Sequence, residues 1–179
     1  AEYERSESIF GIPRSLFHKP RADTPYASEI FGHLLAAPIG PAAGPHTQLA
    51  QNIVCAWLSG GRFIELKTVQ IMDELKIDRP CIDMEDEGYN VEWSQELKLE
   101  QSASEYIKAW ALLHILPRLL GFENAPFGTV FNMSVGYNLE GIKSPGVQRF
   151  IASIRDAKEA LPAAVDAVAK AWPGVRDVE

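Results

Sequence analysis

Residues 38–70 decide the fold of this chain. They read Pro-Ile-Gly-Pro-Ala-Ala-Gly-Pro-His at 38–46, an amphipathic run at 47–58, and Gly-Gly-Arg-Phe-Ile-Glu-Leu-Lys-Thr-Val-Gln at 60–70. This order predicts a strand, a tight turn, a helix and a second strand. Two strands that are joined by a helix run parallel to each other. We therefore expect an α/β fold with a parallel sheet.

Two features lie where the expected strands end. The turn after the first strand carries Ala42, Ala43 and Gly44, whose small side chains let a flat ligand approach the backbone. Lys67 lies near the C-terminal end of the second strand, and in parallel α/β folds that end faces the ligand. A cation beside a platform of small residues suits an electron-rich cofactor or an oxyanion.

The second strand is expected to alternate. Ile64, Leu66 and Thr68 then face the helices, while Glu65 and Lys67 face the interior or the site. The helix before this strand is expected from Thr47, as its N-cap, to residue 58. The glycines at 60 and 61 end that helix.

The rest of the chain divides into an arm, a long loop and further expected helices and strands. Residues 1–35 read as a leading arm, with a short strand possible within 30–38, and residues 70–100 form a long acidic excursion. A helix is expected from Ser102 or Ser104 to residue 116, just before Pro117. A third strand is expected over 127–135, followed by helices over 147–158 and 161–172.

Composition narrows the class of protein. The chain has 179 residues, 46% of them hydrophobic, and a net charge of −7, which argues against nucleic acid as a partner. The longest apolar run, at 109–116, is too short to cross a membrane. Cys55 and Cys81 form no disulfide framework or metal pattern, so a reducing cytoplasmic location is expected. The glycine-rich nucleotide motifs and the zinc-protease and hydrolase motifs are absent from the sequence.

A resemblance adds to these patterns. At 38–44 and 65–68 the sequence resembles the FMN barrel of dihydroorotate and dihydropyrimidine dehydrogenases. Over most of its length it is more similar to a large bacterial flavin and iron–sulfur oxidoreductase that is often labelled a selenate reductase subunit. Residues 41–52, 63–70 and 131–143 carry that similarity, the last reading Phe-Asn-Met-Ser-Val-Gly-Tyr-Asn-Leu-Glu-Gly-Ile-Lys.

The resemblance implies a TIM (β/α)8 barrel of the dihydroorotate dehydrogenase type, of which this chain covers roughly the first three βα units. Residues 1–35 would be an N-terminal arm and residues 36–179 the N-terminal portion of the FMN-binding barrel, within a longer protein. The resemblance implies catalytic roles for Lys67 and Asn90. The residues that it implies to bind the cofactor are Ala42, Ala43, Gly44, Lys67, Thr68 and Asn132.

The same resemblance implies what these 179 residues lack. The catalytic Cys or Ser loop, the FMN phosphate site, the iron–sulfur ligands and the FAD-binding glycines of such enzymes find no counterpart here. They are expected in the remainder of the polypeptide or in redox partner subunits, so the fragment alone should be inactive. The implied reaction moves electrons between FMN and a small-molecule substrate.

Plainer interpretations remain open at this point. Lys67 could be a surface lysine or could pair with Glu65, and the small residues at 42–44 could simply pack under a helix. Turn chemistry explains Asn90 and Asn138 as well as ligand binding does, and the acidic residues at 83–87 fit a solvated loop. The whole region could be a non-catalytic structural or subunit-contact module of a redox complex, or a compact flavodoxin-like domain.

Overall fold

A computed structural model describes residues 2–21, 23–70, 82–83, 89–90, 97–122, 124–136 and 138–172. The helices are α1 (Glu2–Ser6), α2 (Ala50–Leu58), α3 (Leu99–Leu119), α4 (Leu139–Ile142), α5 (Pro145–Arg155) and α6 (Leu161–Ala171), with 3-10 turns η1 (Arg14–Leu16) and η2 (Pro45–Thr47). The strands are β1 (Ser8–Ile9), β2 (Ile12–Pro13), β3 (Ser28–Ile30), β4 (His33–Leu35), β5 (Phe63–Glu65), β6 (Val69–Gln70), β7 (Ile82–Asp83), β8 (Tyr89–Asn90), β9 (Val130–Asn132) and β10 (Val135–Gly136).

Parallel pairing joins the second and third expected strands. β5 pairs with β9, Glu65 opposite Asn132, and β6 pairs with β10 further along the same two segments. The stretch around Ile39 is not a regular strand, but its carbonyl accepts hydrogen bonds from the amides of Arg62 and Phe63 at 2.8 and 3.1 Å. The first segment therefore lies beside the second, as the sequence pattern predicted.

The second strand does not keep the expected alternation. Ile64 and Leu66 are buried in the core, but the next core residue is Val69 and not Thr68. The strand is interrupted at residues 66–68, and this interruption shifts which side chains face the helices by one position. The expectation that Thr68 faces the helices with Ile64 and Leu66 is therefore wrong.

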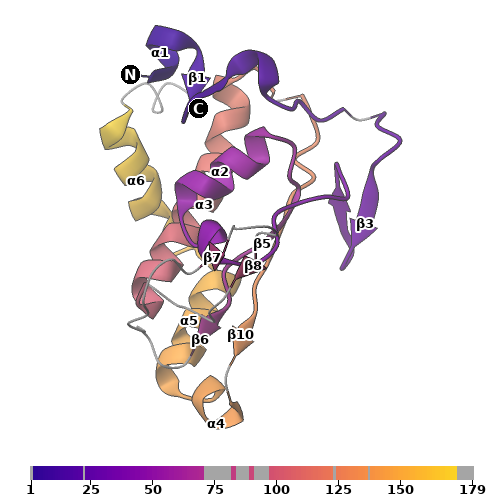
Figure 1. Cartoon of the computed structure of the whole chain (residues 1–179). Coiled ribbons are helices and arrows are strands. Elements are labelled where there is room, and N and C mark those ends of the chain that lie inside the picture. The colour runs from indigo at the N-terminus through magenta and orange to yellow at the C-terminus, as the bar shows by residue number, and fades with distance from the viewer. Residues whose placement is uncertain are drawn as a thin grey trace.

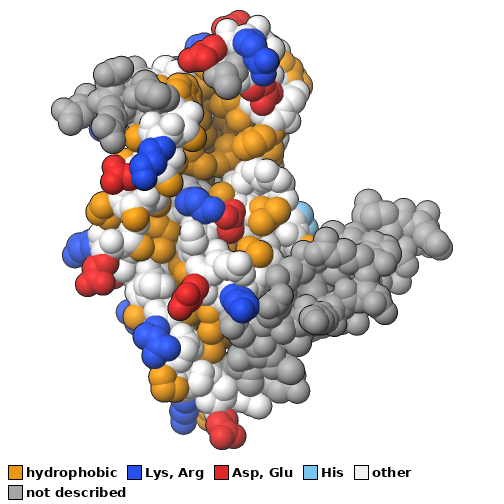
Figure 2. Space-filling model, turned by 90° about the vertical axis from the view of Figure 1, so that its left-hand side faces the viewer, with side chains coloured by type: hydrophobic (Ala, Val, Ile, Leu, Met, Phe, Trp, Pro, Cys, Tyr) orange, Lys and Arg blue, Asp and Glu red, His pale blue; other side chains and the backbone are white. Residues whose placement is uncertain are grey.

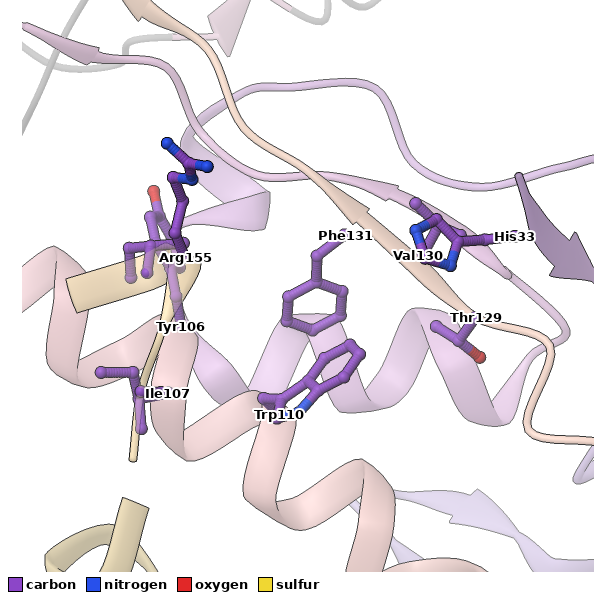
Figure 3. Close-up of a pocket in the computed structure, with 10 residues that line it drawn as sticks. His33, Tyr106, Ile107, Trp110, Thr129, Val130, Phe131 and Arg155 are labelled. Carbon is purple, nitrogen blue, oxygen red and sulfur yellow. The ribbon is translucent and has the colours of Figure 1, made fainter. Parts of the chain in front are cut away.

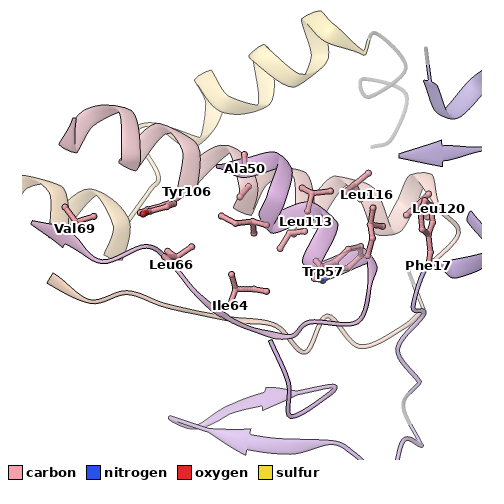
Figure 4. Close-up of a cluster of buried hydrophobic side chains, with 14 of the residues drawn as sticks. Phe17, Ala50, Trp57, Ile64, Leu66, Val69, Tyr106, Leu113, Leu116 and Leu120 are labelled. Carbon is pink, nitrogen blue, oxygen red and sulfur yellow. The ribbon is translucent and has the colours of Figure 1, made fainter. Parts of the chain in front are cut away.

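The main core lies between the parallel strands and the helices. Helices α2, α3, α5 and α6 lie on one side of these strands, whereas the hairpin of β3 and β4 projects away on the other side (Figure 1). Trp57 and Leu113 meet the strand residue Ile64 inside this layer, and all three are at most 2% exposed (Figure 4). Burying such apolar side chains supplies most of the stability of the layer.

The N-terminal arm has more structure than its sequence indicated. Instead of one short strand within 30–38, β3 and β4 form an antiparallel hairpin. Both residues of its tight turn, Phe31 and Gly32, have positive φ angles of 54° and 76°. Such a turn matches the twist of the two strands, although a bulky residue with positive φ is strained.

The helix boundaries differ from expectation at three places. Helix α2 begins at Ala50, so Thr47 does not cap it and lies in η2 instead. Helix α3 begins at Leu99 and includes Pro117, which lies in its last turn. Helix α5 begins at Pro145 after the N-cap Ser144, whose side chain accepts a hydrogen bond from Val147. The expected helix over 161–172 is confirmed by α6.

Candidate functional site at the ends of the parallel strands

The first strand segment approaches β5 so closely that only glycine fits at position 40. A Cβ atom on Gly40 would lie 1.6 Å from the backbone oxygen of Phe63. Two residues after Phe63, the amide of Glu65 donates to the carbonyl of Pro41 at 3.2 Å. The small-residue turn therefore starts at the C-terminal end of β5, as a ligand-facing turn should.

The amide groups of this turn are used within the chain. The amide of Ala43 donates to the Oε2 atom of Glu65 at 3.3 Å, and the amide of Gly44 donates to the hydroxyl of Thr47 at 3.2 Å. Pro41 and Pro45 have no amide hydrogen. The turn is thus not built as an anion-binding nest. Its exposed Ala42 and half-buried Ala43 offer methyl groups and peptide planes, which suit a flat ring.

Glu65 and Asn132 lie side by side at the end of the strand pair. They are direct partners in the parallel register, and both are half-buried. Their neighbours Ile64 and Phe131 pack toward the helices, so alternation places Glu65 and Asn132 on the opposite face. Glu65 is the carboxylate that holds the turn through Ala43. Its neighbour Asn132 presents an amide next to it.

Lys67 is buried just after β5. It is 4% exposed, and its Nζ atom donates to the carbonyl of Thr68 at 3.3 Å. Its own amide donates to the carbonyl of Thr47 at 3.4 Å, and its carbonyl accepts from the hydroxyl of Tyr106 at 2.8 Å. A buried lysine at a strand end differs from the surface lysine that the sequence left as an alternative.

The other candidates divide into three cases. Thr68 is half-buried, and its Cγ2 atom lies 3.6 Å from the position of a Cβ on Gly136. Asn138 is exposed and caps α4, because its side chain accepts from the amide of Gly141 at 2.8 Å, which is turn chemistry. The backbone of Asn90 pairs in β8, whereas its side chain and residues 84–88 lie outside the described residues.

A pocket of about 420 Å³ lies elsewhere, between α3, β9 and the end of α5 (Figure 3). Trp110 of α3 meets Phe131 edge to face, with ring centroids 5.0 Å apart, and His33 and Arg155 lie at its two ends. This pocket is on the helix-facing side of Phe131. It is therefore not the space in which Glu65 and Asn132 lie.

Sequence reasoning missed two residues that organise the site. Thr47 was expected as a helix cap, and Tyr106 was not singled out. The one available signal for Tyr106 was its place on the buried face of α3, together with Ser102, Ala109 and Leu113. A tyrosine among buried neighbours needs a partner for its hydroxyl. The sequence could not show that this partner is the carbonyl of Lys67.

Comparison with known proteins decides the family. The family described as "Oxidoreductase YgfK, N-terminal TIM-barrel domain" matches residues 10–171. The chain belongs to the YgfK family. The match confirms the expected fold class. β5 and β9 are parallel strands of this TIM-barrel domain, and the segment that ends at Pro41 lies beside β5. In TIM barrels the C-terminal ends of the strands carry the active site.

Two curated relatives support the assignment to the YgfK family. Proteins named "Putative oxidoreductase YgfK" from Escherichia coli K12 and from Escherichia coli O157:H7 are each 54% identical over 158 residues. The alignment covers 88% of this chain but 15% of the length of each relative. No solved structure matches the chain. In the described part of the chain, no helix is long and apolar enough to span a membrane.

Proposed function

We propose that this chain supplies one half of an FMN site in a flavin-dependent oxidoreductase of the YgfK family. The observation that carries the proposal is the buried Lys67, which lies just past the end of β5 and whose amide donates to the carbonyl of Thr47, shortly after the small-residue turn at 41–44. A flat ring lying on Ala42 and Ala43 would meet this cation at its edge. The selenate reductase-like role and the small-molecule substrate that the resemblance implies belong to this proposal.

The residues fit a flavin ring better than a phosphate group. The amides of Ala43 and Gly44 are already used by Glu65 and Thr47, so the turn has few donors to offer an anion. It offers instead small side chains over which an aromatic ring can lie. The FMN phosphate would be held by residues beyond these 179, as TIM-barrel phosphate sites follow the seventh and eighth strands.

Bound FMN would supply the electron-transfer chemistry. Lys67 would place a fixed positive charge where negative charge gathers on reduction, and a pre-positioned charge in a buried site lowers the barrier to that change. Asn132 would present its amide to the ligand from the neighbouring strand, and Glu65 would keep the turn in place through Ala43. FAD and iron–sulfur clusters belong to the proposal only as cofactors of the remaining polypeptide or of redox partner subunits.

The test is the rate of flavin reduction in the protein that is expressed from its native gene and then purified. In Lys67→Ala, FMN remains bound, but we expect reduction to slow by about 100-fold, the typical cost of removing one donor that stabilises developing charge. The matched control is Lys158→Ala, which removes an exposed lysine at the surface. Flavin content is measured from the visible spectrum and reduction by stopped flow. Equal reduction rates at equal flavin occupancy would remove Lys67 from the reaction.

A second candidate function is a structural or subunit-contact module without a cofactor. The β3–β4 hairpin favours it, because Phe31 is 72% exposed and Leu34 is 52% exposed, with Tyr26 and Ile39 similarly exposed nearby. Large exposed apolar side chains in one region mark contact surfaces. On another face, shown in Figure 2, side chains of both charges are interspersed with apolar ones. A colourless native protein that binds no added FMN would favour this second function.

A further inference from the structure

The main chain of Lys67 is held by groups from two other elements. Its amide donates to the carbonyl of Thr47 in η2 at 3.4 Å, a long hydrogen bond. Its carbonyl accepts from the hydroxyl of Tyr106 in α3 at 2.8 Å, which is an ordinary length. Because Lys67 lies in the interruption between β5 and β6, these bonds replace the regular strand ladder at this residue.

Tyr106 has little freedom to move. Its side chain is 2% exposed and meets the ring of Phe150 edge to face, with centroids 6.5 Å apart. In Figure 4 its oxygen points from α3 toward the strand that carries Leu66 and Val69. Burial raises the pKa of the Tyr106 hydroxyl, so it stays protonated and acts as a donor. A buried hydroxyl without a partner is costly, so this bond fixes the carbonyl of Lys67.

The same network reaches the small-residue turn. The hydroxyl of Thr47 accepts from the amide of Gly44 at 3.2 Å and donates to the carbonyl of Gly44 at 3.1 Å. The amide of Thr47 also donates to that carbonyl, at 2.9 Å. Gly44, Thr47, Lys67 and Tyr106 are thus connected by consecutive hydrogen bonds. The chain of bonds links the turn to the residue that carries the cation.

We propose that Tyr106 is a positioning residue, which fixes Lys67 relative to the turn at 42–44 so that a bound flavin ring meets the ammonium group in one geometry. The inference rests on the proposed function of Lys67. Tyr106 itself does not touch the ligand in this proposal. It acts from the helix layer through one backbone carbonyl, and small displacements of a catalytic group are costly in rate.

The test compares the rates of flavin reduction in Tyr106→Phe and Lys67→Ala, each made in the protein that is expressed from its native gene. Tyr106→Phe keeps the ring against Phe150 but removes the hydroxyl. We expect flavin reduction to slow by about fivefold to tenfold, as for the loss of one hydrogen bond that positions a reacting group. Tyr3→Phe is the matched control, because it removes a tyrosine hydroxyl that is bonded to Arg14 in the N-terminal arm. The control should leave the reduction rate unchanged.

A double variant separates positioning from general loosening of the fold. If Tyr106 acts through Lys67, adding Tyr106→Phe to Lys67→Ala produces no further slowing. If the role of Tyr106 is purely structural, Tyr106→Phe slows the Lys67→Ala variant by the same factor as it slows the wild type. Additive effects, or an unchanged rate in Tyr106→Phe when Lys67→Ala is slow, overturn the inference while the proposed function stands.

A second measurement does not depend on flavin. Amide hydrogen exchange at Lys67 reports how often its bond to Thr47 opens. If Lys67→Ala leaves flavin reduction unchanged, the proposed function fails. Hydrogen exchange then tests whether Tyr106 fixes the backbone of Lys67. Faster exchange at Lys67 in Tyr106→Phe, with unchanged exchange in Tyr3→Phe, supports the positioning role. Equal exchange in both variants overturns it.

Discussion

The two ends of β5 each carry a buried cation, and the two are held in different ways. Arg62, before the strand, is fully buried and donates from its guanidinium to the carbonyls of Trp57, Gly61 and His18 at 2.7, 2.8 and 3.2 Å. It also lies over the ring of Trp57, 4.8 Å from the centroid. Lys67, after the strand, is held through its backbone, and its Nζ donates to the carbonyl of the adjacent Thr68.

This difference fits a structural role for Arg62 beside the catalytic role that we propose for Lys67. The carbonyls that bind Arg62 come from the end of α2, the next turn and the N-terminal arm, so Arg62 ties three segments together. A cation near the C-terminus of α2 also interacts favourably with the helix dipole. The hydrogen bonds that hold the backbone of Lys67, to Thr47 and Tyr106, lie at the C-terminal end of β5. The comparison agrees with the general division of TIM barrels into a stability face and a reactive face.

The largest expected effect is at Gly40, on the Arg62 side. In Gly40→Ala the new methyl group would lie 1.6 Å from the backbone oxygen of Phe63, and neither backbone can move without breaking the bonds of Ile39. We expect a loss of about 4 kcal/mol in the free energy of unfolding, measured by urea denaturation. The matched control is Gly136→Ala, where the nearest atom is Thr68 Cγ2 at 3.6 Å. If both variants are equally stable, the segment around Gly40 does not pack against Phe63 as closely as the 1.6 Å distance indicates.

Arg62 is the next test of the comparison. Arg62→Met keeps the apolar stem but leaves the carbonyls of Trp57, Gly61 and His18 without their donor. The unfolding free energy should fall by about 3 kcal/mol, because lost hydrogen bonds to a charged group are costly when buried. Arg149→Met, at an exposed position of α5, is the control and should cost little. A loss in Arg62→Met no larger than in the control would show that Arg62 does not tie the segments together.

The sequence predicted the parallel strands and most helices because their signals are local. Apolar spacing and the residues Ser59-Gly60-Gly61 correctly ended α2, and the Ala-rich run after Pro162 gave α6. The start of α3 was missed because its N-cap is Lys98, whose amide donates to the side chain of Gln101, and not one of the serines. The end of α3 was also missed, because the helix continues through Pro117 to Leu119.

The site was predictable only in part. Lys67 and the small-residue turn could be placed at strand ends by order along the chain. The interruption at 66–68 could not be foreseen, and it makes simple alternation fail for Thr68. The bond between Tyr106 and Lys67 joins residues 39 positions apart. The buried role of Arg62 likewise depends on His18, which is 44 positions away, and no local pattern reports such a contact.

The smallest expected effect is a pH dependence at the Arg62 end. Burial, and secondly the positive charge of Arg62, lower the pKa of His18 below its usual value of 6.5. The unfolded chain therefore binds more protons than the folded one once the pH falls through 6.5, so stability falls with acidification and levels off below the folded pKa. His18 is only partly withdrawn from water, so solvent screening limits this contribution to about 0.3 kcal/mol.

His18→Gln should flatten the pH dependence of unfolding between about pH 7 and pH 5, because glutamine cannot take up a proton. His114→Gln is the matched control. Burial lowers the pKa of His114 as well, but its ring stacks on Phe127 and is not paired with Arg62. His114→Gln keeps the contribution of His18 to the pH dependence of unfolding and should lose only the contribution of His114. If the slope in His18→Gln equals that of the wild type, neither burial nor the charge of Arg62 lowers the pKa of His18. The arginine would then act on the arm only through the carbonyl of His18.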